Sequence, residues 1–123
     1  MKNKRKTWTK KELVQEISDK FQQDSNLVRI LLQAFLDGIR EKLSAGERLE
    51  FRDFGVFDVV PRKAKIGRNP RTKVEVKIPQ HLAVKFTAGK EMTEKMVELT
   101  KNHPEMLSEL TKNPPKLLNK PIA

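Results

Sequence analysis

Hydrophobic residues near the start of the chain recur at helical spacing. Leu13, Ile17 and Phe21 stand four residues apart, which predicts one apolar stripe along a helix. The preceding Thr9 and Glu12 have the spacing of a capping box, in which a hydroxyl and a carboxylate satisfy the free amides of a helix start. We therefore predict that the first helix begins directly after Thr9.

A second, longer helix is predicted to run from Asp24, which suits an N-cap, to Gly46, where glycine favours an end. Its apolar positions cover a wide part of the helical circumference. They are Leu27, Val28, Ile30, Leu31, Leu32, Ala34, Phe35, Leu36, Ile39 and Leu43. A small domain has too little surface of its own to bury such a face. The pattern favours a dimer, in which a partner chain covers the helix; the alternative is a helix enclosed within one compact monomer.

The middle of the chain alternates apolar and polar residues with the period of β-strands. Strands are predicted at 49–51, at 56–60 and at 74–78, where β-branched and aromatic residues gather. Pro79 and the three residues after it are expected to break the returning strand before Val84 and Phe86. The strands at 56–60 and 74–78 are therefore the candidate arms of a β-ribbon.

A third helix and a C-terminal extension follow. Met92, Met96 and Leu99 recur at helical spacing. The pattern Leu-Thr-Lys-Asn-x-Pro-x-x-Leu then occurs twice, starting at Leu99 and at Leu110. Because proline suits the first turn of a helix, each copy could end one helix and start another. Residues 100–123 are expected to form short helices or a mobile tail, and docking on the dimer body or on a partner protein is the functional alternative.

The segment that joins the two ribbon strands is rich in cations. Residues 65–73 place one proline among four basic side chains, and no acidic residue lies between 62 and 73. Pro70 has no N–H for a strand ladder and fixes its own φ, so with Asn69 it suits the tip of a ribbon. The cations would repel one another without a polyanion nearby. The segment predicts a β-ribbon whose tip touches DNA; an ordinary solvated hairpin is the alternative. Its cations are Arg62, Lys63, Lys65, Arg68, Arg71 and Lys73.

Composition narrows the class of partner. A net charge of +10 over 123 residues implies a polyanion, which is usually nucleic acid, with an anionic membrane surface as the rival. No apolar run approaches transmembrane length, and the N-terminus lacks an apolar signal core, with four basic residues among its first six. We therefore expect a cytoplasmic protein that does not bind a membrane.

Catalysis finds no support in the sequence. The absence of cysteine excludes disulfides, thiol chemistry and cysteine-based zinc sites. His81 and His103 lack the spacing of metal ligands, and no nucleophile elbow or glycine-rich phosphate loop is present. We therefore predict a binding protein that is not an enzyme, with no cofactor, no metal and no small-molecule substrate.

Three motifs give the chain a family resemblance. In order, they are Asp53-Phe54-Gly55-Val56-Phe57, Gly67-Arg68-Asn69-Pro70-x-Thr72 and Val84-x-Phe86-x-x-Gly89-Lys90. With them the chain resembles the bacterial HU and integration host factor proteins, histone-like DNA-bending dimers, from about Thr9 to about Val97. The resemblance implies a basic N-terminal extension at 1–8, a DNA-binding domain at 9–99 and a C-terminal extension at 100–123.

The resemblance also implies the fold. This would be an α+β intertwined dimer with a base of two N-terminal helices, a three-stranded antiparallel sheet, a long β-ribbon arm at about 60–78 and a C-terminal helix. Aromatic residues would serve packing and the dimer interface rather than base stacking. The expected interface residues are Leu31, Phe35, Ile39, Phe54, Phe57 and Phe86.

The DNA site is likewise implied by the resemblance. Pro70 of each protomer would enter between two base pairs in the minor groove, where an apolar wedge unstacks the bases and kinks the duplex. Cations of the arm would line the groove, and Lys10 and Lys90, at two helix starts, would meet the flanking backbone. The whole expected set is Lys10, Arg62, Lys63, Lys65, Arg68, Asn69, Pro70, Arg71, Thr72, Lys73, Lys77 and Lys90.

Two residues depart from the family pattern. Lys73 stands where the family usually has glycine, and it would stiffen the ribbon tip or alter its turn. Asp53 stands at the first glycine of a common Gly-Phe-Gly, where its carboxylate would either cap a turn or repel the nearby phosphates.

The sequence therefore predicts an architectural protein of the bacterial nucleoid. It would bind and bend double-stranded DNA as a dimer, homodimeric or heterodimeric, with little dependence on sequence. One alternative is a site-specific bender of the integration host factor type, which relies on indirect readout. Another is a protein-interaction module that uses its C-terminal tail and attaches only weakly to DNA.

Overall fold

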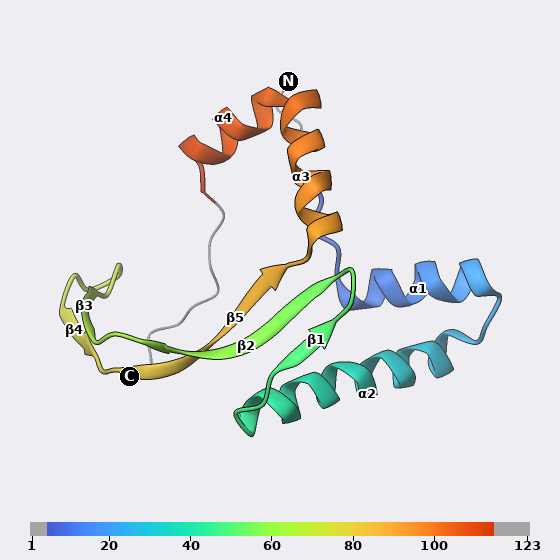
Figure 1. Cartoon of the computed structure of the whole chain (residues 1–123), viewed down its shortest axis with the longest axis horizontal. Coiled ribbons are helices and arrows are strands. Elements are labelled where there is room, and N and C mark those ends of the chain that lie inside the picture. Colours follow the sequence, from blue (N-terminus) through green and yellow to red (C-terminus); the bar gives the residue numbers. More distant parts are fainter. Residues whose placement is uncertain (1–4, 115–123) are drawn as a thin grey trace. The chain divides into compact units, whose positions relative to one another are not determined.

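The computed structural model describes residues 5–114, in two compact units that meet in sequence between Ser44 and Ala45. The predicted α+β class is confirmed, with two helices in the N-terminal unit and an antiparallel sheet, a ribbon and two helices in the C-terminal unit. Figure 1 labels the elements: α1 (Lys10–Phe21), α2 (Ser25–Ser44), β1 (Leu49–Phe51), β2 (Gly55–Arg62), β3 (Lys65–Arg68), β4 (Glu75–Ile78), β5 (His81–Ala88), α3 (Lys90–Asn102) and α4 (Pro104–Lys112).

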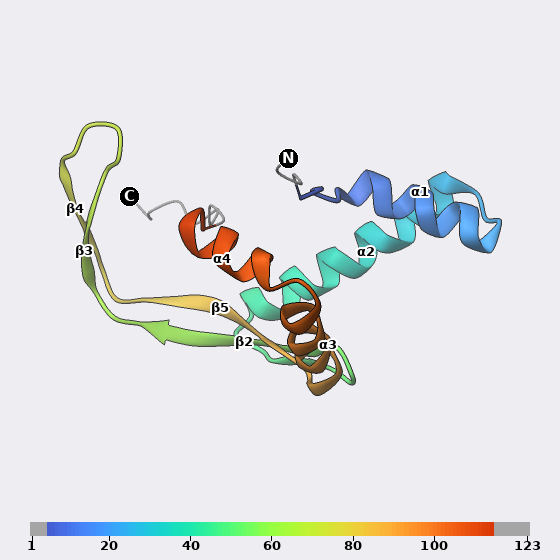
Figure 2. The same cartoon turned by 90° about the horizontal axis from the view of Figure 1, so that it is seen from above.

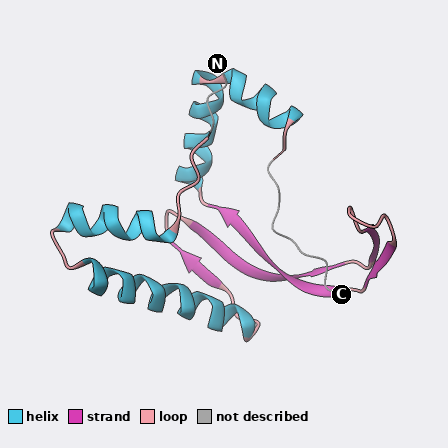
Figure 3. Ribbon diagram, turned by 180° about the vertical axis from the view of Figure 1, so that it is seen from behind, coloured by secondary structure: helices cyan, strands magenta, loops and turns pink. Residues whose placement is uncertain are grey.

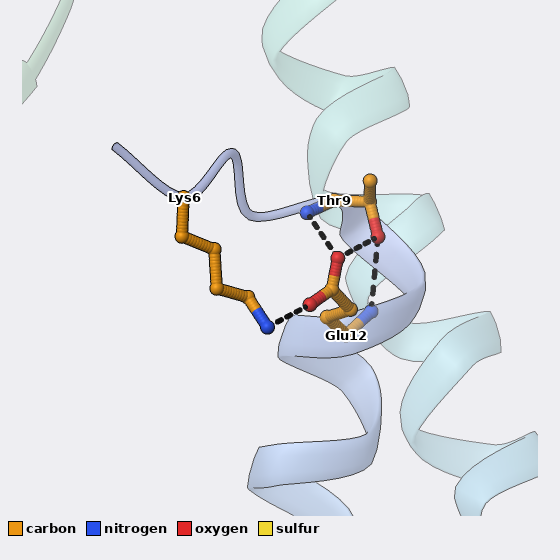
Figure 4. Close-up of polar contacts among 3 residues, drawn as sticks. All are labelled: Lys6, Thr9 and Glu12. Carbon is orange, nitrogen blue, oxygen red and sulfur yellow. Dashed lines mark hydrogen bonds and ion pairs between the residues drawn. The ribbon is translucent and has the colours of Figure 1, made fainter. Parts of the chain in front are cut away.

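Helix α1 begins where the sequence predicts it (Figure 4). The Thr9 hydroxyl accepts a hydrogen bond from the Glu12 backbone N–H at 3.3 Å, and Glu12 Oε1 accepts one from the Thr9 N–H at 3.4 Å. Lys6 adds an ion pair, with Nζ 2.7 Å from Glu12 Oε2, and its Nζ lies 4.6 Å from the centre of the Trp8 ring. The hydrogen bond from Lys6 is the main cause that lowers the pKa of the Glu12 carboxyl. The capping box is thus confirmed, and it is joined by a lysine of the N-terminal extension.

Helix α2 is capped as expected but is poorly covered. Asp24 Oδ2 accepts a hydrogen bond from the Leu27 N–H at 3.1 Å, and Gly46, just past the helix, has a φ of 81°. Val28 is buried, whereas Leu31 and Phe35 are 60% and 55% exposed. Much of the apolar face of this helix is thus open to solvent in the single chain.

The C-terminal unit is built on a three-stranded antiparallel sheet with the strand order β1-β2-β5. Strands β2 and β5 pair along their whole length, from Gly55 opposite Ala88 to Arg62 opposite His81. Strands β3 and β4 form a separate antiparallel ribbon. The ribbon connects β2 to β5 in sequence and extends from the end of this strand pair (Figure 2).

The sheet and the ribbon are separated by a break in the pairing. Residues 63–64 on one side and 79–80 on the other belong to no strand. Pro79 lacks the N–H that a ladder needs, which accounts for the break on its side. Figure 2 shows the strands changing direction at this point. The predicted break is shorter than expected, because His81 already pairs with Arg62. The segment 62–81 is called the arm below.

Four phenylalanines form a cluster on the sheet. The ring centres of Phe57 and Phe86 lie 4.7 Å apart, and those of Phe54 and Phe86 lie 5.5 Å apart. Phe51 meets Phe57 edge-on at 6.1 Å. Gly55 is buried beneath this cluster, where an added Cβ would lie 2.6 Å from the Phe86 ring. The motif Asp53-Phe54-Gly55 therefore needs glycine at position 55, because a side chain there would clash with the Phe86 ring.

Two helices follow the sheet (Figure 3). Helix α3 ends at Asn102, and α4 begins at Pro104, which occupies the first turn of that helix. The prediction that the first Leu-Thr-Lys-Asn-x-Pro copy ends one helix and starts another is confirmed. The second copy begins at Leu110 inside α4, and its last residues lie outside the described part of the chain.

Candidate nucleic-acid interface

The tip of the arm is a turn held by Asn69. The Asn69 N–H donates to the Val74 carbonyl at 2.9 Å, and the Lys73 N–H donates to the Asn69 carbonyl at 2.7 Å. The side-chain oxygen Asn69 Oδ1 accepts from the N–H groups of Arg71, at 2.9 Å, and Thr72, at 3.4 Å. Asn69 therefore has a structural task in the free protein, because it fixes the turn that presents Pro70.

Pro70 and Lys73 lie near the two ends of this turn, and a different backbone constraint applies to each. Pro70 is exposed and, having no N–H, needs no partner in the ladder. Lys73 has a φ of 60°, in the left-handed region that costs a side-chain-bearing residue about 1 kcal/mol or more. The turn geometry thus explains why glycine suits this position, and Lys73 adopts the same conformation at a cost.

Asp53, the second departure from the family pattern, likewise has a backbone conformation that suits glycine. Its φ is 66°, again in the left-handed region, which aspartate tolerates better than most residues. The turn after it is held by the Phe54 N–H, which donates to the Phe51 carbonyl at 3.0 Å. The Phe54 carbonyl accepts from the Gly89 N–H at 2.8 Å, which ties this turn to the start of α3.

A concavity along the arm brings together half of the expected DNA-binding set. None of its lining residues is acidic among those that the structure describes. From the expected set it is lined by Arg62, Lys63, Lys65, Arg68, Asn69 and Pro70, and its other walls are Ala64, Gly67, Val76, Ile78, His81, Leu82 and Ala83. The concavity thus joins a charged surface to an exposed proline ring.

The remaining members of the set lie elsewhere. Arg71, Thr72 and Lys73 belong to the tip turn, and Lys77 stands opposite Ile66 in the ribbon. None of these four expected residues is among those that line the concavity.

The two lysines outside the arm stand at helix starts, in different units. Lys10 Nζ donates to Gln33 Oε1 on α2. Lys90 Nζ lies 3.9 Å from Glu94 Oε1 and is 90% exposed. An exposed ion pair of this kind contributes little, so the Lys90 ammonium is available to another anion.

Sequence reasoning missed two residues of the arm. Glu75 stands opposite Arg68 in the ribbon, with Oε1 3.9 Å from Arg68 Nη2, so one cation of the set has a carboxylate neighbour. His81 was expected to lie in a strand break, but it lines the concavity. The neighbours of both residues depend on the strand register, which could not be predicted from the sequence pattern.

The expected dimer-interface residues are mostly open to solvent in the single chain. Leu31, Phe35, Phe54 and Phe86 are exposed, and Ile39 and Phe57 are half-buried. Within the described residues, no group of acidic or histidine side chains could hold a metal ion, and no helix is long and apolar enough to cross a membrane.

Comparisons with known proteins agree with the motifs. Residues 8–97 match the family model described as bacterial DNA-binding protein. A probable DNA-binding protein HU from Chlamydia pneumoniae is 48% identical over 98 residues, which cover 79% of this chain and 97% of the relative. The integration host factor subunit beta of Nitrosomonas europaea is 37% identical over 99 residues, covering 77% of this chain and 91% of the relative.

Solved structures show the same likeness. A cocrystal structure of Anabaena HU with DNA has a TM-score of 0.64 at 35% identity, covering 72% of this chain and 97% of that one. An HU mutant from Thermotoga maritima has a TM-score of 0.53 at 27% identity, covering 72% and 99%. The chain therefore belongs to the bacterial DNA-binding protein family, the family of HU and integration host factor.

Proposed function

We propose that this protein is an architectural factor that binds and bends double-stranded DNA as a dimer, with little dependence on sequence. The observation that carries the proposal is the arm, where four cations, an exposed proline and no carboxylate are among the described residues that line one concavity. Membership of a DNA-binding family supports it. DNA binding places the protein on the bacterial nucleoid, in the cytoplasm.

Attraction to DNA comes mainly from the cations. The chain carries a net charge of +10, and neutralising phosphates releases the counterions that DNA condenses around itself. Arg62 and Lys65 lie along the concavity, and Arg68 lies towards the tip, so they would follow the backbone for the length of the arm. Such contacts position the protein but carry no sequence information.

Bending comes from the tip. Pro70 offers a rigid apolar ring at the end of a turn that Asn69 holds in place. A ring of this kind inserted between base pairs costs a few kcal/mol in unstacking, and the bent duplex offsets this cost because it contacts more protein. The wedge needs no base-specific hydrogen bond, which fits weak sequence preference.

Dimerisation supplies two arms. Among the residues that the structure describes, apolar side chains of α2 such as Ile30 and Leu31 are exposed in the single chain, and burying them would be favourable. A second copy of the chain would bury them, in keeping with the dimers of this family. Two arms then hold one duplex from two points, which a monomer could not do.

Weak sequence preference is favoured over the site-specific alternative. Identity to the chlamydial HU relative is 48%, against 37% to the integration host factor subunit. Gel-shift titrations on random, A·T-rich and nicked duplexes test this directly. We expect similar affinity for the random and A·T-rich duplexes and tighter binding to the nicked one, which bends more easily. A preference for one intact sequence by a factor of about 1,000 or more would instead indicate site-specific binding.

A further inference from the structure

His81 lies on the concave face of the arm, opposite a member of the expected DNA-binding set. It pairs with Arg62 across β2 and β5, and directly opposed residues of an antiparallel pair project to the same side of the sheet. Both residues line the concavity. The His81 imidazole and the Arg62 guanidinium therefore lie on the same face of the sheet.

One ring nitrogen of His81 is already committed. His81 Nδ1 lies 2.9 Å from the Pro79 carbonyl oxygen. A carbonyl oxygen can only accept, so Nδ1 carries the hydrogen and donates. In the neutral ring, Nε2 is then an acceptor, and it becomes a donor only when the ring takes up a second proton.

The groups that face His81 are positive. Arg62 stands opposite it in β2, and Lys63, in the connecting residues, and Lys65 and Arg68, in β3, line the same concavity. Glu75 of β4 is the neighbour of Arg68 and does not line the concavity. An anion that enters the concavity therefore meets four cations and no carboxylate among the lining residues that the structure describes, and His81 is one of those lining residues.

We propose that His81 is a DNA-contacting residue that binds in its protonated form; this inference rests on the proposed function of the arm. Phosphate oxygens are acceptors, and so are the minor-groove edges of A·T pairs. A neutral Nε2 offers them no hydrogen, whereas a protonated Nε2 donates a charge-assisted bond. Each arm would thus take up a proton at His81 when it binds DNA, so DNA affinity would rise as the pH falls.

The test compares affinity for one intact duplex at about pH 6 and about pH 8, at fixed ionic strength, where imidazole is the side chain that ordinarily titrates. The variants are His81→Gln, which is never charged, His81→Lys, which stays charged, and His103→Gln, the matched control on the chain's other histidine. His103 bonds to Glu105 at the start of α4, far along the chain from the arm.

For the parent and for His103→Gln, we expect affinity to be roughly tenfold higher at the lower pH, the scale of a charge-assisted hydrogen bond. His81→Gln should show a flat profile at the parent's high-pH affinity, and His81→Lys a flat profile near its low-pH affinity. Calorimetric titrations in two buffers of different ionisation enthalpy should show proton uptake by the parent and none by His81→Gln.

Two outcomes overturn different claims. If the parent profile is flat, or if His81→Gln keeps the parent's pH dependence and proton uptake, His81 is not the titrating contact, and DNA binding by the arm stands. If neither the parent nor His103→Gln binds the duplex at either pH, the proposed function itself fails, and the inference about His81 fails with it.

Discussion

The apolar face of α2 and the concave face of the arm are both exposed in the single chain, but their chemistry differs. On α2 the open side chains are hydrophobic, such as Leu31 at 60% and Phe35 at 55% exposure. On the arm, four arginines and lysines line the concavity together with Pro70 and apolar side chains such as Leu82. The exposed hydrophobic side chains of α2 are unfavourable in water, whereas the cations of the arm are well solvated.

This difference indicates how long each partner stays. Exposed apolar surface costs roughly 25 cal/mol per Å², so α2 favours a permanent cover, and we propose that a second copy of the chain provides it. Exposed cations are well solvated and repel one another only weakly in salt. The arm can therefore stand free and take DNA reversibly, and salt should control that step but not dimerisation.

The largest effect is expected from breaking the apolar face. Leu31→Asp places a carboxylate where the partner chain would bury it, at a cost of about 3 kcal/mol or more for an unpaired charge. We expect loss of the dimer at low micromolar concentration, a lower unfolding temperature and loss of tight DNA binding. Analytical ultracentrifugation measures the first of these effects directly.

The matched control for that variant is Asn26→Asp. It adds the same charge to the first turn of α2 and keeps the acceptor that Arg29 Nη2 uses at 2.8 Å. This control should remain dimeric. A Leu31→Asp protein that stays dimeric and stable would show that α2 is not the dimerisation surface.

The next effect concerns the charged face alone. Replacing Arg68 and Arg71 together by alanine should weaken DNA binding by about 100-fold and lower the slope of log affinity against log salt by about two per arm. The dimer should be unaffected. Replacing Lys101 and Lys112 together by alanine removes the same charge from α3 and α4, and it should leave the slope nearly unchanged. Equal slopes for the two double variants would show that the arm is not part of the DNA-binding surface.

A smaller effect is expected at the tip. Lys73→Gly relieves the left-handed conformation at a φ of 60°, a gain of about 1 kcal/mol. We expect slower amide hydrogen exchange in the tip turn, by roughly fivefold after correction for intrinsic rates. Lys77→Ala removes a cation from the same ribbon without changing a strained residue, so it should not slow exchange there. Unchanged exchange in Lys73→Gly would mean that the turn stores no strain.

The smallest effect belongs to the start of α1. The hydrogen bond from Lys6 and the bonds to Thr9 lower the pKa of the Glu12 carboxyl from its ordinary value. A carboxylate with a lowered pKa stabilises the fold above its unfolded pKa, and this contribution is lost as the pH falls through the folded one. Glu12→Gln should thus lower the unfolding temperature slightly at neutral pH, and this difference should shrink as the pH falls through the folded pKa of Glu12. Glu16→Gln, outside the capping box, should show no such difference, and identical pH profiles for the two variants would contradict this account of the cap.

Local signals in the sequence predicted the helices well. The Thr9–Glu12 capping box, the Asp24 cap and Pro104 at a helix start each rest on a few neighbouring residues, and the structure has all of them. Such signals work because the atoms that satisfy a helix end lie within one turn of it. The α+β class followed from them and from the alternation in the middle of the chain.

The site was predicted less completely, because its geometry depends on register. The sequence pointed to the cations and to Pro70, but not to the pairing of Arg62 with His81 or of Arg68 with Glu75. A shift of one residue in register would send each of these side chains to the other face. The left-handed backbone conformations of Asp53 and Lys73 could not be predicted from these residues themselves. Glycine would have indicated such a conformation, but this chain has other residues at both positions.

The most direct test of the whole account is the bend angle of an intact duplex, measured by energy transfer between its ends at saturating protein. The parent should bend the duplex, and Pro70→Ala should bend it markedly less while still binding through the cations. Pro61→Ala, which changes an exposed proline of β2 away from the tip, should bend it like the parent. A nicked duplex, which kinks without a wedge, should be bent by all three proteins. If Pro70→Ala bends intact DNA as sharply as the parent does, the arm does not act through a proline wedge, and the central claim is wrong.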